Sequence, residues 1–451
     1  MELNQVHKVH MVGIGGIGMS ALARFLHLRG KTVTGYDRTS TPLTSALQAE
    51  GINVYFEANP AKVKGADLMI YTPAVPASFP EFQTAEALGV PMMKRAEVLG
   101  MISRAYKTVA IAGTHGKTST TGLTTYLLRE CGVDCTGFIG GITNNYNTNF
   151  VNGESEWMVV EADEFDRSFL HLSPNIAVIT SMDADHLDIY GEPAALQESF
   201  RDFGDRLDEG GTLFMHHDLE PLPLENGPKI FGYGVGGGRF RSDNLRHRGL
   251  GVTFDFHGPT GTFRDLHLNL PGKYNVDNAT AAVAIAMALG CSETDIRNGL
   301  DTFSGIKRRF DIRYRSEQVV HIDDYAHHPS EIAAVVSAVR DMLPGYKLIA
   351  AFQPHLYSRT RDFHEGFAEE LSRADAVVLL DIYPAREAPM EGVSSDMIYA
   401  RIDVGEKART DLEGLVDTLK QFKTRPVVVL TIGAGNIDTQ VAATQQLVST
   451  W

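Results

Sequence analysis

Residues 108–118 read TVAIAGTHGKT, and this stretch decides the fold expected for the middle of the chain. A β-branched, apolar run ends at Ala112, a turn with two glycines follows, and Lys117 opens a stretch with helical spacing. A strand that enters a helix through Gly-Lys-Thr is typical of a phosphate-binding loop, whose backbone amides surround phosphate oxygens. Ile111 stands where the usual motif has its first glycine, so a simple helix-capping turn remains the alternative.

In a phosphate-binding loop each polar residue has an expected task. We expect Lys117 to reach the β- and γ-phosphates and the Thr118 hydroxyl to coordinate Mg²⁺. Acidic segments follow the next two predicted strands, EADE at 161–164 and DADH at 183–186. Because neighbouring parallel strands end at the same edge of a sheet, these segments are expected beside the loop, where they could meet metal and triphosphate. Solvated acidic loops or helix caps are the alternative.

A second glycine turn, GIGGIG at 13–18, lies between a predicted strand at 8–12 and a predicted helix at 19–29. Asp37 ends the following strand, about 20 residues on. This matches the dinucleotide fingerprint, in which glycines let the backbone approach a diphosphate at a helix N-terminus. The pattern suits NAD or the diphosphate of a nucleotide sugar equally, and a tight turn without a ligand is also possible.

Strands alternate with helical stretches along most of the 451 residues, which predicts an α/β protein with mainly parallel sheets. We expect three domains: a Rossmann-like domain at 1–104, a central P-loop ATPase-like domain at 105–308, and a C-terminal Rossmann-like α/β domain at 309–451. Within the central domain, alternating apolar residues at 230–270 predict an antiparallel extension.

Composition excludes several classes of protein. Forty-one Lys and Arg against 56 Asp and Glu give a formal charge of -15, which argues against a protein that coats nucleic acid. Three cysteines are too few for a disulfide framework, so the cytoplasm is the expected compartment. No apolar run approaches the roughly 20 residues that span a bilayer, and no membrane association is expected.

Three further segments carry polar residues after strands or at a helix start. DDYAHHP at 323–329 and QPHLYSRTR at 353–361 each follow a predicted strand, and they are either surface or a substrate site whose arginines could hold carboxylates. Asn275 and Asn278 lie at the start of an Ala-rich helix, where helix capping is the simplest interpretation.

These motifs, in this order, resemble the Mur ligase family over nearly the whole chain, and within it the branch that adds L-alanine. The segments that carry the resemblance are 13–20, 113–118, 161–164, 183–186, 324–329 and 433–436. The resemblance implies that the first domain binds the UDP part of UDP-N-acetylmuramate, the central domain binds ATP, and the C-terminal domain closes over both with L-alanine. In the family reaction ATP phosphorylates the muramoyl carboxylate, and the amine of alanine attacks the resulting acyl phosphate.

The resemblance also implies residue roles. The implied ATP contacts are Gly113, Thr114, His115, Gly116, Lys117, Thr118, Ser119, Asn275, Asn278, Arg309 and Asp324. The implied ligands of two Mg²⁺ ions are Thr118, Glu161 and His186. The implied UDP-sugar contacts are Gly13, Gly15, Gly16, Ile17, Gly18, Asp37 and Thr72. The implied amino-acid contacts are Tyr325, His327 and Arg359. The residues implied in the chemistry itself are Lys117, Glu161, His186, Arg309 and His327.

Two features concern the branch of the family. Several other members carry a carbamylated lysine after the Asp-His motif, and no lysine lies between His186 and Lys229, as expected of the alanine-adding branch. Leu356 stands where many alanine-adding members have an arginine, which leaves the strictness for alanine over glycine or serine open.

The alternatives are a recycling ligase that adds a preformed peptide to the same sugar nucleotide, a nicotinamide-dependent dehydrogenase, and a non-catalytic nucleotide-binding regulator. A monomer or a homodimer fits the sequence.

Overall fold

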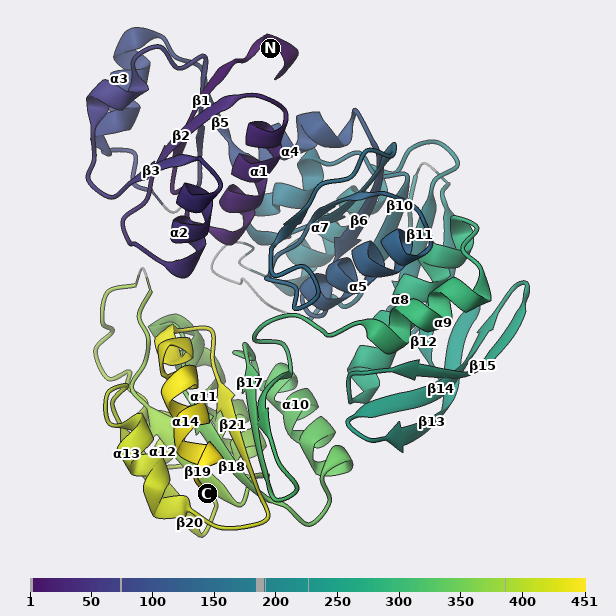
Figure 1. The fold of residues 1–451 in the computed structure, drawn as a ribbon, viewed down its shortest axis with the longest axis vertical. Helices are drawn as coiled ribbons and strands as arrows, with labels where there is room; N and C mark the ends of the chain where they lie inside the picture. Colours follow the sequence, from purple (N-terminus) through teal and green to yellow (C-terminus); the bar gives the residue numbers. More distant parts are fainter. Residues whose placement is uncertain (1–2, 74, 184–189, 191, 226, 386) are drawn as a thin grey trace. The chain divides into compact units, whose positions relative to one another are not determined.

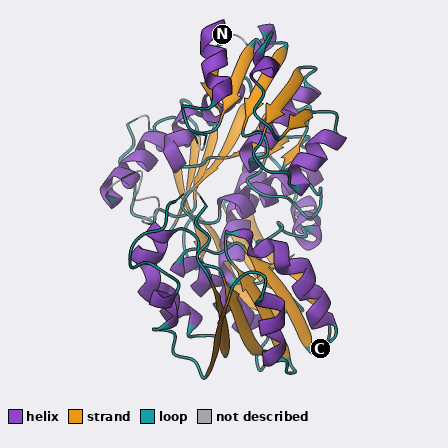
Figure 2. Ribbon diagram, turned by 90° about the vertical axis from the view of Figure 1, so that its left-hand side faces the viewer, coloured by secondary structure: helices purple, strands orange, loops and turns teal. Residues whose placement is uncertain are grey.

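The computed structural model describes residues 3–451 except 74, 184–189, 191, 226 and 386. Three β-sheets carry helices on their faces (Figures 1 and 2), which confirms the predicted α/β class with three sheet-centred domains. Contacts divide the chain into two compact units. The first comprises Met1–Asp243, Phe256–Arg264 and Asp277–Phe303, and the second comprises Asn244–Asp255, Asp265–Val276 and Ser304–Trp451.

The N-terminal sheet is parallel and has the order β3-β2-β1-β4-β5. Its strands are β1 (Lys8–Val12), β2 (Thr32–Tyr36), β3 (Asn53–Tyr55), β4 (Leu68–Tyr71) and β5 (Met92–Lys94), and its helices are α1 (Ile17–Leu28), α2 (Pro42–Ala49), α3 (Pro80–Leu88) and α4 (Arg95–Ser103). The chain leaves β1 toward β2 on one side and later returns to β4 on the other. This topological switch point is where open α/β sheets bind ligands.

The central sheet has ten strands in the order β15-β14-β13-β12-β11-β10-β6-β9-β7-β8. These are β6 (Lys107–Ala112), β7 (Thr136–Phe138), β8 (Phe150–Val151), β9 (Trp157–Glu161), β10 (Ile176–Ile179), β11 (Thr212–His216), β12 (Lys229–Val235), β13 (Phe240–Arg248), β14 (Gly251–Gly258) and β15 (Gly261–Leu268). The helices are α5 (Lys117–Glu130), α7 (Pro193–Gly204), α8 (Lys273–Ala288) and α9 (Glu293–Thr302). As predicted, β6 has parallel neighbours on both sides, β9 and β10.

The first two sheets share a continuous apolar core inside the first unit. One side of α1 buries Met19, Leu22 and Leu26 in a cluster that also contains residues of β7, β9 and β10. Arg24 completes the junction, because its guanidinium donates to Glu50 at 2.7 Å and to Asn149 of the central part. The N-terminal sheet is therefore held to the central sheet by apolar packing and by the hydrogen bond from Arg24 to Asn149, while the ion pair with Glu50 fixes Arg24 within the N-terminal part.

The third sheet lies in the second unit and has the order β16-β17-β21-β18-β19-β20. Its strands are β16 (Asp311–Arg315), β17 (Val319–Asp324), β18 (Lys347–Phe352), β19 (Ala376–Leu380), β20 (Glu406–Thr410) and β21 (Val427–Ile432). Its helices are α10 (Pro329–Met342), α11 (Tyr357–Leu371), α12 (Asp396–Tyr399), α13 (Leu415–Leu419) and α14 (Val441–Ser449). Apolar clusters cover both faces, as the continuous hydrophobic runs of its parallel strands require. Among the described residues, no helix is long and apolar enough to cross a membrane.

Element ends differ from the prediction where local capping decides them. The helix predicted at 19–29 begins at Ile17, because Gly16 adopts the extended N-cap conformation. The Ala-rich helix at whose start the sequence places Asn275 and Asn278 begins at Lys273, so Asn275 lies within its first turn. In the predicted extension, β12 and β13 pair in parallel over three residues beside a turn at Gly236–Gly238, while two-residue connections join β13 to β14 and β14 to β15.

Candidate functional site

The loop between β6 and α5 is shaped by two glycines in conformations that favour glycine. Gly113 has φ +131°, and a Cβ there would lie 2.0 Å from the Thr180 hydroxyl. Gly116 has φ +80°, and a Cβ there would lie 2.7 Å from the Asn278 amide oxygen. A side chain at either position would therefore meet both backbone strain and a close neighbour. The helix begins at Lys117, as the sequence predicted, with its first amides toward the loop.

Lys117 is held inside this loop by main-chain and carboxylate oxygens. Its ammonium donates to the Gly113 carbonyl at 2.6 Å and lies 2.8 Å from the Glu164 carboxylate. Burial disfavours the charged form, but the carboxylates of Glu164, Asp163 and Glu161 outweigh it and raise the Lys117 pKa. The side chain therefore carries a positive charge at the position where phosphate oxygens are expected.

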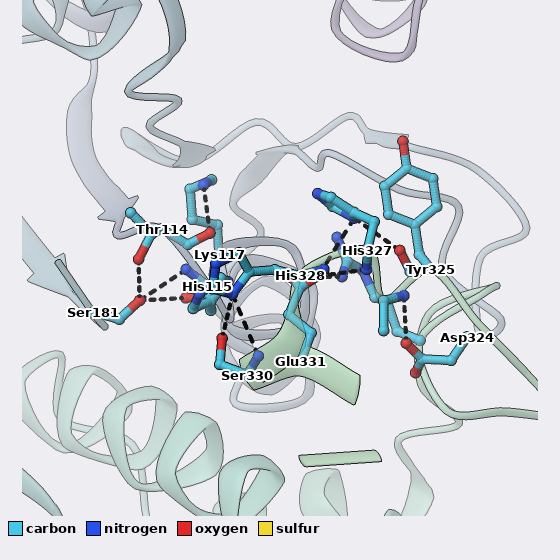
Figure 3. A network of polar contacts seen from close by, with 12 residues as sticks. Thr114, His115, Lys117, Ser181, Asp324, Tyr325, His327, His328, Ser330 and Glu331 are labelled. Carbon is cyan, nitrogen blue, oxygen red and sulfur yellow. Dashed lines mark hydrogen bonds and ion pairs between the residues drawn. The ribbon is translucent and has the colours of Figure 1, made fainter. Parts of the chain in front are cut away.

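Short polar side chains that follow the neighbouring strand β10 hold the loop in place (Figure 3). The Ser181 hydroxyl lies 2.9 Å from that of Thr114 and accepts from the His115 amide at 2.8 Å, and the Thr180 hydroxyl donates to the His115 carbonyl. His115 also lies 3.2 Å from the Asp183 carboxylate. Thr180 and Ser181 were not predicted from the sequence, because a threonine or a serine after a strand has no spacing signal. Glu164 lies in the predicted acidic segment 161–164, but its contact with Lys117 was not predicted. Only the pairing of β6 with β10 brings Ser181 to the loop.

Two oxygen donors stand where the sequence predicted metal ligands. Thr118 is buried in the first turn of α5, and Glu161 ends β9, the neighbour of β6. The Glu161 carboxylate accepts from the Gly140 amide at 3.1 Å, and a Cβ at Gly140 would lie 2.3 Å from its oxygens. Hydroxyl and carboxylate oxygens are the donors that Mg²⁺ prefers, so this set fits the ion. The third predicted ligand, His186, lies outside the described residues, as does Asp185.

The two asparagines of α8 have different surroundings. The amide oxygen of Asn278 accepts from the Thr120 hydroxyl of α5 at 3.1 Å, and it faces Gly116 of the loop. Asn275 donates its amide to the Pro271 carbonyl at 2.7 Å. Asn278 thus lies at the phosphate loop, whereas Asn275 makes a local contact with the turn before α8, as a donor and not as the accepting N-cap that helix capping requires. Ser119, in the first turn of α5, is part-buried.

The N-terminal glycine turn lies at the switch point of its sheet. Gly13 has φ +83°, and a Cβ there would lie 2.5 Å from Thr72, the residue that follows β4. Asp37 accepts from the Gly15 amide at 2.7 Å, and it would collide with a side chain at Gly15. Gly18 allows Arg95 to approach, since a Cβ would lie 2.9 Å from its guanidinium.

This geometry brings Gly13, Gly15, Asp37 and Thr72 to one edge of the sheet. Gly16 caps α1, and Ile17 exposes 37% of its surface beside it. An exposed isoleucine at the edge of a glycine turn offers an apolar surface to a bound group. Arg95 was not predicted from the sequence, because a lone arginine at a helix start carries no pattern.

In the second unit, the Asp324 carboxylate accepts hydrogen bonds from two backbone amides. It is buried, and it accepts from the Phe310 amide at 2.7 Å and the Ala326 amide at 2.8 Å. Burial raises its pKa to about 6. Asp323 instead accepts from the Thr431 hydroxyl at 2.7 Å, which distinguishes the two adjacent carboxylates.

Arg309 and its neighbour Arg308 enclose the ring of Tyr325. Their guanidinium carbons lie 5.0 and 4.9 Å from the ring centroid. Arg309 also lies 3.9 Å from the Glu331 carboxylate, a long ion pair. Arg308 and Phe310, on either side of Arg309, have positive φ values of 63° and 47°. Strained backbone of this kind clusters at binding and catalytic sites.

His327 and Arg359 lie close enough for the charge of Arg359 to act on the His327 ring. His328 and Arg361, which follow them closely in sequence, have other partners. The His327 pKa is lowered to about 4, chiefly by burial; the charges of Arg359 and Arg309 also lower it, and Glu331 opposes them. His327 Nδ1 lies 2.9 Å from the Tyr325 carbonyl (Figure 3), so Nδ1 carries the proton and Nε2 the lone pair.

By contrast, His328 caps α10 through Ser330. Arg359 is 9% exposed on α11, whereas Arg361 pairs with Asp362 at the surface. Arg359 and Arg361 therefore separate into an inward and an outward residue, whereas His327 and His328 are both part-buried and differ in their partners.

The glycines of segment 433–436 pack on Gln353 at the end of β18. A Cβ at Gly433 would lie 2.7 Å from the Gln353 carbonyl, and one at Gly435 would lie 2.5 Å from its amide oxygen. The Gln353 amide donates to Asn436 at 2.8 Å. Segment 433–436 therefore packs against the end of β18, the strand that leads to His355 and Arg359.

Three family models together match most of the chain. Residues 8–107 match the model described as Mur ligase family, catalytic domain; residues 111–286 match the Mur ligase middle domain; residues 308–435 match the Mur ligase, glutamate ligase domain.

Curated relatives and solved structures extend this similarity. The UDP-N-acetylmuramate–L-alanine ligase of Flavobacterium psychrophilum is 46% identical over 98% of both chains, and that of Phocaeicola vulgatus is 44% identical over 98% of both. The crystal structure of UDP-N-acetylmuramate-alanine ligase from Thermotoga maritima is 28% identical, with a TM-score of 0.84 over 98% of this chain and 99% of that one. A murein peptide ligase from Psychrobacter arcticus has the same fold, with a TM-score of 0.69 at 20% identity over 99% of both chains.

Proposed function

The chain belongs to the Mur ligase family, and from that premise we propose that it joins L-alanine to the carboxylate of UDP-N-acetylmuramate with ATP, as a step of peptidoglycan precursor synthesis. The observation that carries the proposal is the charged, buried Lys117 in a Gly-Lys-Thr loop whose strand lies between β9, which ends in Glu161, and β10, which is followed by Asp183. The relatives named above carry this activity in their names.

The chemistry explains why an ATP site must accompany a carboxylate-bearing substrate. A carboxylate is a poor electrophile, so its oxygen first attacks the γ-phosphorus of ATP, and ADP leaves. The uncharged amine of alanine then attacks the acyl carbon, phosphate leaves, and the nitrogen loses a proton to give the amide. Lys117 stabilises the charge on the transferring phosphoryl group, and the amides at the start of α5 hold the phosphates.

We propose further nucleotide contacts for residues of both units. In the first unit these are Gly113, Thr114, His115, Gly116, Thr118, Ser119 and Asn278. In the second unit they are Asn275, Arg309 and Asp324. The Asp324 carboxylate is already occupied by two backbone amides, so its role in this proposal is to hold the loop next to Arg309.

Mg²⁺ is proposed as the cofactor, with Thr118 and Glu161 as ligands and His186 as a ligand of a second ion. When bound, the ion supplies charge neutralisation on the phosphate oxygens. The chain's own contribution is to orient these oxygens: Gly140 donates to Glu161, and the first turn of α5 fixes Thr118.

For the amino acid, we propose that Arg359 pairs with the carboxylate and that His327 faces the amine. The neutral His327 imidazole has its lone pair on Nε2 and can accept a hydrogen bond from the ammonium group, which a protonated ring would repel. Tyr325 borders the same pocket. The strictness for alanine depends on this region, in which Leu356 has a left-handed φ of 71°.

For the sugar nucleotide, we propose that the diphosphate lies over Gly13, Gly15, Gly16 and Gly18, with Ile17, Asp37 and Thr72 around it. The cytoplasm is the proposed compartment, because both nucleotides are found there, and a monomer or homodimer is the proposed state. Light scattering on the purified protein measures the latter.

The test is phosphate release by purified protein with UDP-N-acetylmuramate, L-alanine, ATP and Mg²⁺, against reactions that omit one component. The proposal predicts release only in the complete reaction, with a product heavier than the sugar nucleotide by one alanine residue. Release with a tripeptide but not with alanine identifies a recycling ligase instead. ATP binding without turnover identifies a regulator, and tight NADH binding with no phosphate release identifies a dehydrogenase.

A further inference from the structure

A cluster of two histidines and one aspartate lies at the end of β11, in a part of the first unit that the proposed reaction does not use. His216 is the last residue of the strand, and His217 and Asp218 follow it. One ligand atom from each of the three residues lies within 4.8 Å of the others. His216 Nδ1 lies 3.7 Å and His217 Nδ1 3.1 Å from oxygens of the Asp218 carboxylate. Ligand atoms around a tetrahedral metal are roughly 3.4 Å apart, so these three need little movement to share one ion.

The outer nitrogens of both rings already have acceptor partners. His216 Nε2 lies 3.3 Å from the Asp277 carboxylate, and His217 Nε2 lies 3.1 Å from the Val235 carbonyl. A carbonyl or carboxylate oxygen can only accept, so both Nε2 atoms carry protons. In a neutral ring this leaves the lone pair on Nδ1, and the Asp218 amide approaches His216 Nδ1 at 3.4 Å, consistent with that assignment.

In neutral rings the His217 Nδ1 lone pair thus faces the Asp218 carboxylate at 3.1 Å, and His216 Nδ1, which is approached by the Asp218 amide, lies 3.7 Å from the same carboxylate. A lone pair facing a carboxylate is repulsive unless a proton or a metal cation lies between them. Histidines that bind metal usually donate their other ring N–H to a carboxylate or a backbone carbonyl, which is the pattern of Asp277 and Val235 here. We propose that His216, His217 and Asp218 form a binding site for a divalent transition metal of the zinc type.

The donor set distinguishes this site from the magnesium site proposed beside Lys117. Two imidazole nitrogens with one carboxylate favour Zn²⁺, Co²⁺ or Ni²⁺, whereas Mg²⁺ prefers oxygen donors. Glycines also make room for the rings. A Cβ at Gly237 would lie 2.5 Å from His217 Nδ1, and one at Gly234 would lie 2.7 Å from His217 Cδ2. The glycine-rich turn at 234–238 therefore provides the space in which the His217 ring lies.

The site connects to the phosphate loop through α8. Asp277 holds His216 and also accepts from the Val235 amide at 2.7 Å, and it is the neighbour of Asn278, which faces Gly116. Metal binding therefore fixes the start of α8 against β11 and β12.

The experiment uses the full chain without a histidine tag, stripped of metal with a chelator and kept in excess Mg²⁺. Calorimetry with Zn²⁺ should give one saturable site, and Co²⁺ should give visible absorption bands of a nitrogen-and-oxygen site. Asp218→Ala, which removes a side chain that is 66% exposed, and His217→Ala should both abolish saturable binding. Asp277→Asn should weaken it by roughly 10- to 100-fold, and the exposed His247→Ala is the matched control that should bind as wild type.

Two results would overturn the proposal. One is wild-type protein without a saturable Zn²⁺ site. The other is equal Zn²⁺ affinity in the wild type, Asp218→Ala and His217→Ala, which would mean adventitious binding elsewhere. Nitrogen NMR of the metal-free protein adds a separate check: a His217 ring protonated on both nitrogens, together with no Co²⁺ bands, means that a simple ion pair with Asp218 explains the geometry.

Discussion

The ammonium of Lys117 lies 2.8 Å from the carboxylate of Glu164, whose side chain is fully buried. The ion pair belongs to the phosphate loop itself, because the same ammonium donates to the Gly113 carbonyl. Lys117 thus has a structural partner as well as its proposed phosphate, and phosphate oxygens must compete with Glu164 for its three N–H donors. The two tasks can be separated by mutation.

Lys117→Ala is expected to lower kcat by roughly 10²- to 10³-fold, since a charged donor at the transferring phosphoryl group is lost. It should also destabilise the fold by about 3 kcal/mol, because the buried Glu164 carboxylate loses its partner. Phosphate release and urea unfolding measure the two effects.

The double variant Lys117→Ala/Glu164→Gln is the control for this experiment. Removing the orphaned charge should restore much of the stability and none of the activity. Equal stability of the single and double variants would show that the ion pair does not support the loop.

Arg359→Ala should raise the KM for L-alanine by roughly 10- to 100-fold, the cost of a charge-assisted hydrogen bond, with little change in the KM for ATP. Arg361 provides the matched control, because it lies one half-turn further along α11 and pairs with Asp362 at the surface. Steady-state kinetics of Arg359→Ala and Arg361→Ala measure the KM for L-alanine and the KM for ATP. Similar increases in the two KM values for Arg359→Ala would remove this residue from the amino-acid pocket.

His327 should make the unfolding free energy depend on pH. Its folded pKa of about 4 is below the 6.5 of an unfolded histidine, so between these values the unfolded chain binds a proton that the native protein does not. The stability contribution is therefore complete above pH 6.5 and is lost as the pH falls toward 4. At pH 5 the loss is on the order of 2 kcal/mol.

Urea unfolding of the wild type and of His327→Gln between pH 7 and pH 5 measures this contribution. The variant should lose less stability over that range, and His247→Gln controls for the removal of a histidine as such. Parallel pH curves for the wild type and His327→Gln would contradict the burial argument.

Much of the fold was predictable because its signals are local. The apolar run before Ala112 and the Gly-Lys-Thr that follows predicted β6 and the start of α5 correctly. The partners of the loop were not predictable, because they depend on strand order. Ser181 reaches His115 only because β10 pairs with β6.

Glu164 illustrates the same limit within a segment that the sequence did single out. It turns toward Lys117 because the chain leaves β9 through a 3₁₀ segment at Phe165–His171, in which Asp166 and Arg167 have positive φ. No pattern of residue types in this segment predicts the positive φ values of Asp166 and Arg167. Likewise, Asn275 and Asn278 lie three residues apart on one helix, and only the packing of α8 on α5 gives Asn278 its place at the loop.

Gly116 and Gly132 offer a direct test of why the phosphate loop requires glycine. Both have left-handed backbones, with φ +80° and +81°, and they lie at opposite ends of α5. A Cβ at Gly132 meets nothing within 4 Å, whereas one at Gly116 would lie 2.7 Å from the Asn278 amide oxygen. Alanine at either position therefore costs about 1–2 kcal/mol of backbone strain, and only Gly116→Ala adds a collision of roughly 1–3 kcal/mol.

Urea unfolding of the two alanine variants should show the larger loss for Gly116→Ala, and part of that loss should disappear in Gly116→Ala/Asn278→Ala, where the colliding amide is absent. ATP affinity should fall for Gly116→Ala and stay unchanged for Gly132→Ala, because only the former displaces the amides that receive the phosphates. If the two variants lose the same stability and bind ATP equally, backbone conformation alone explains the glycine, and the close approach of Asn278 has no role in shaping the loop.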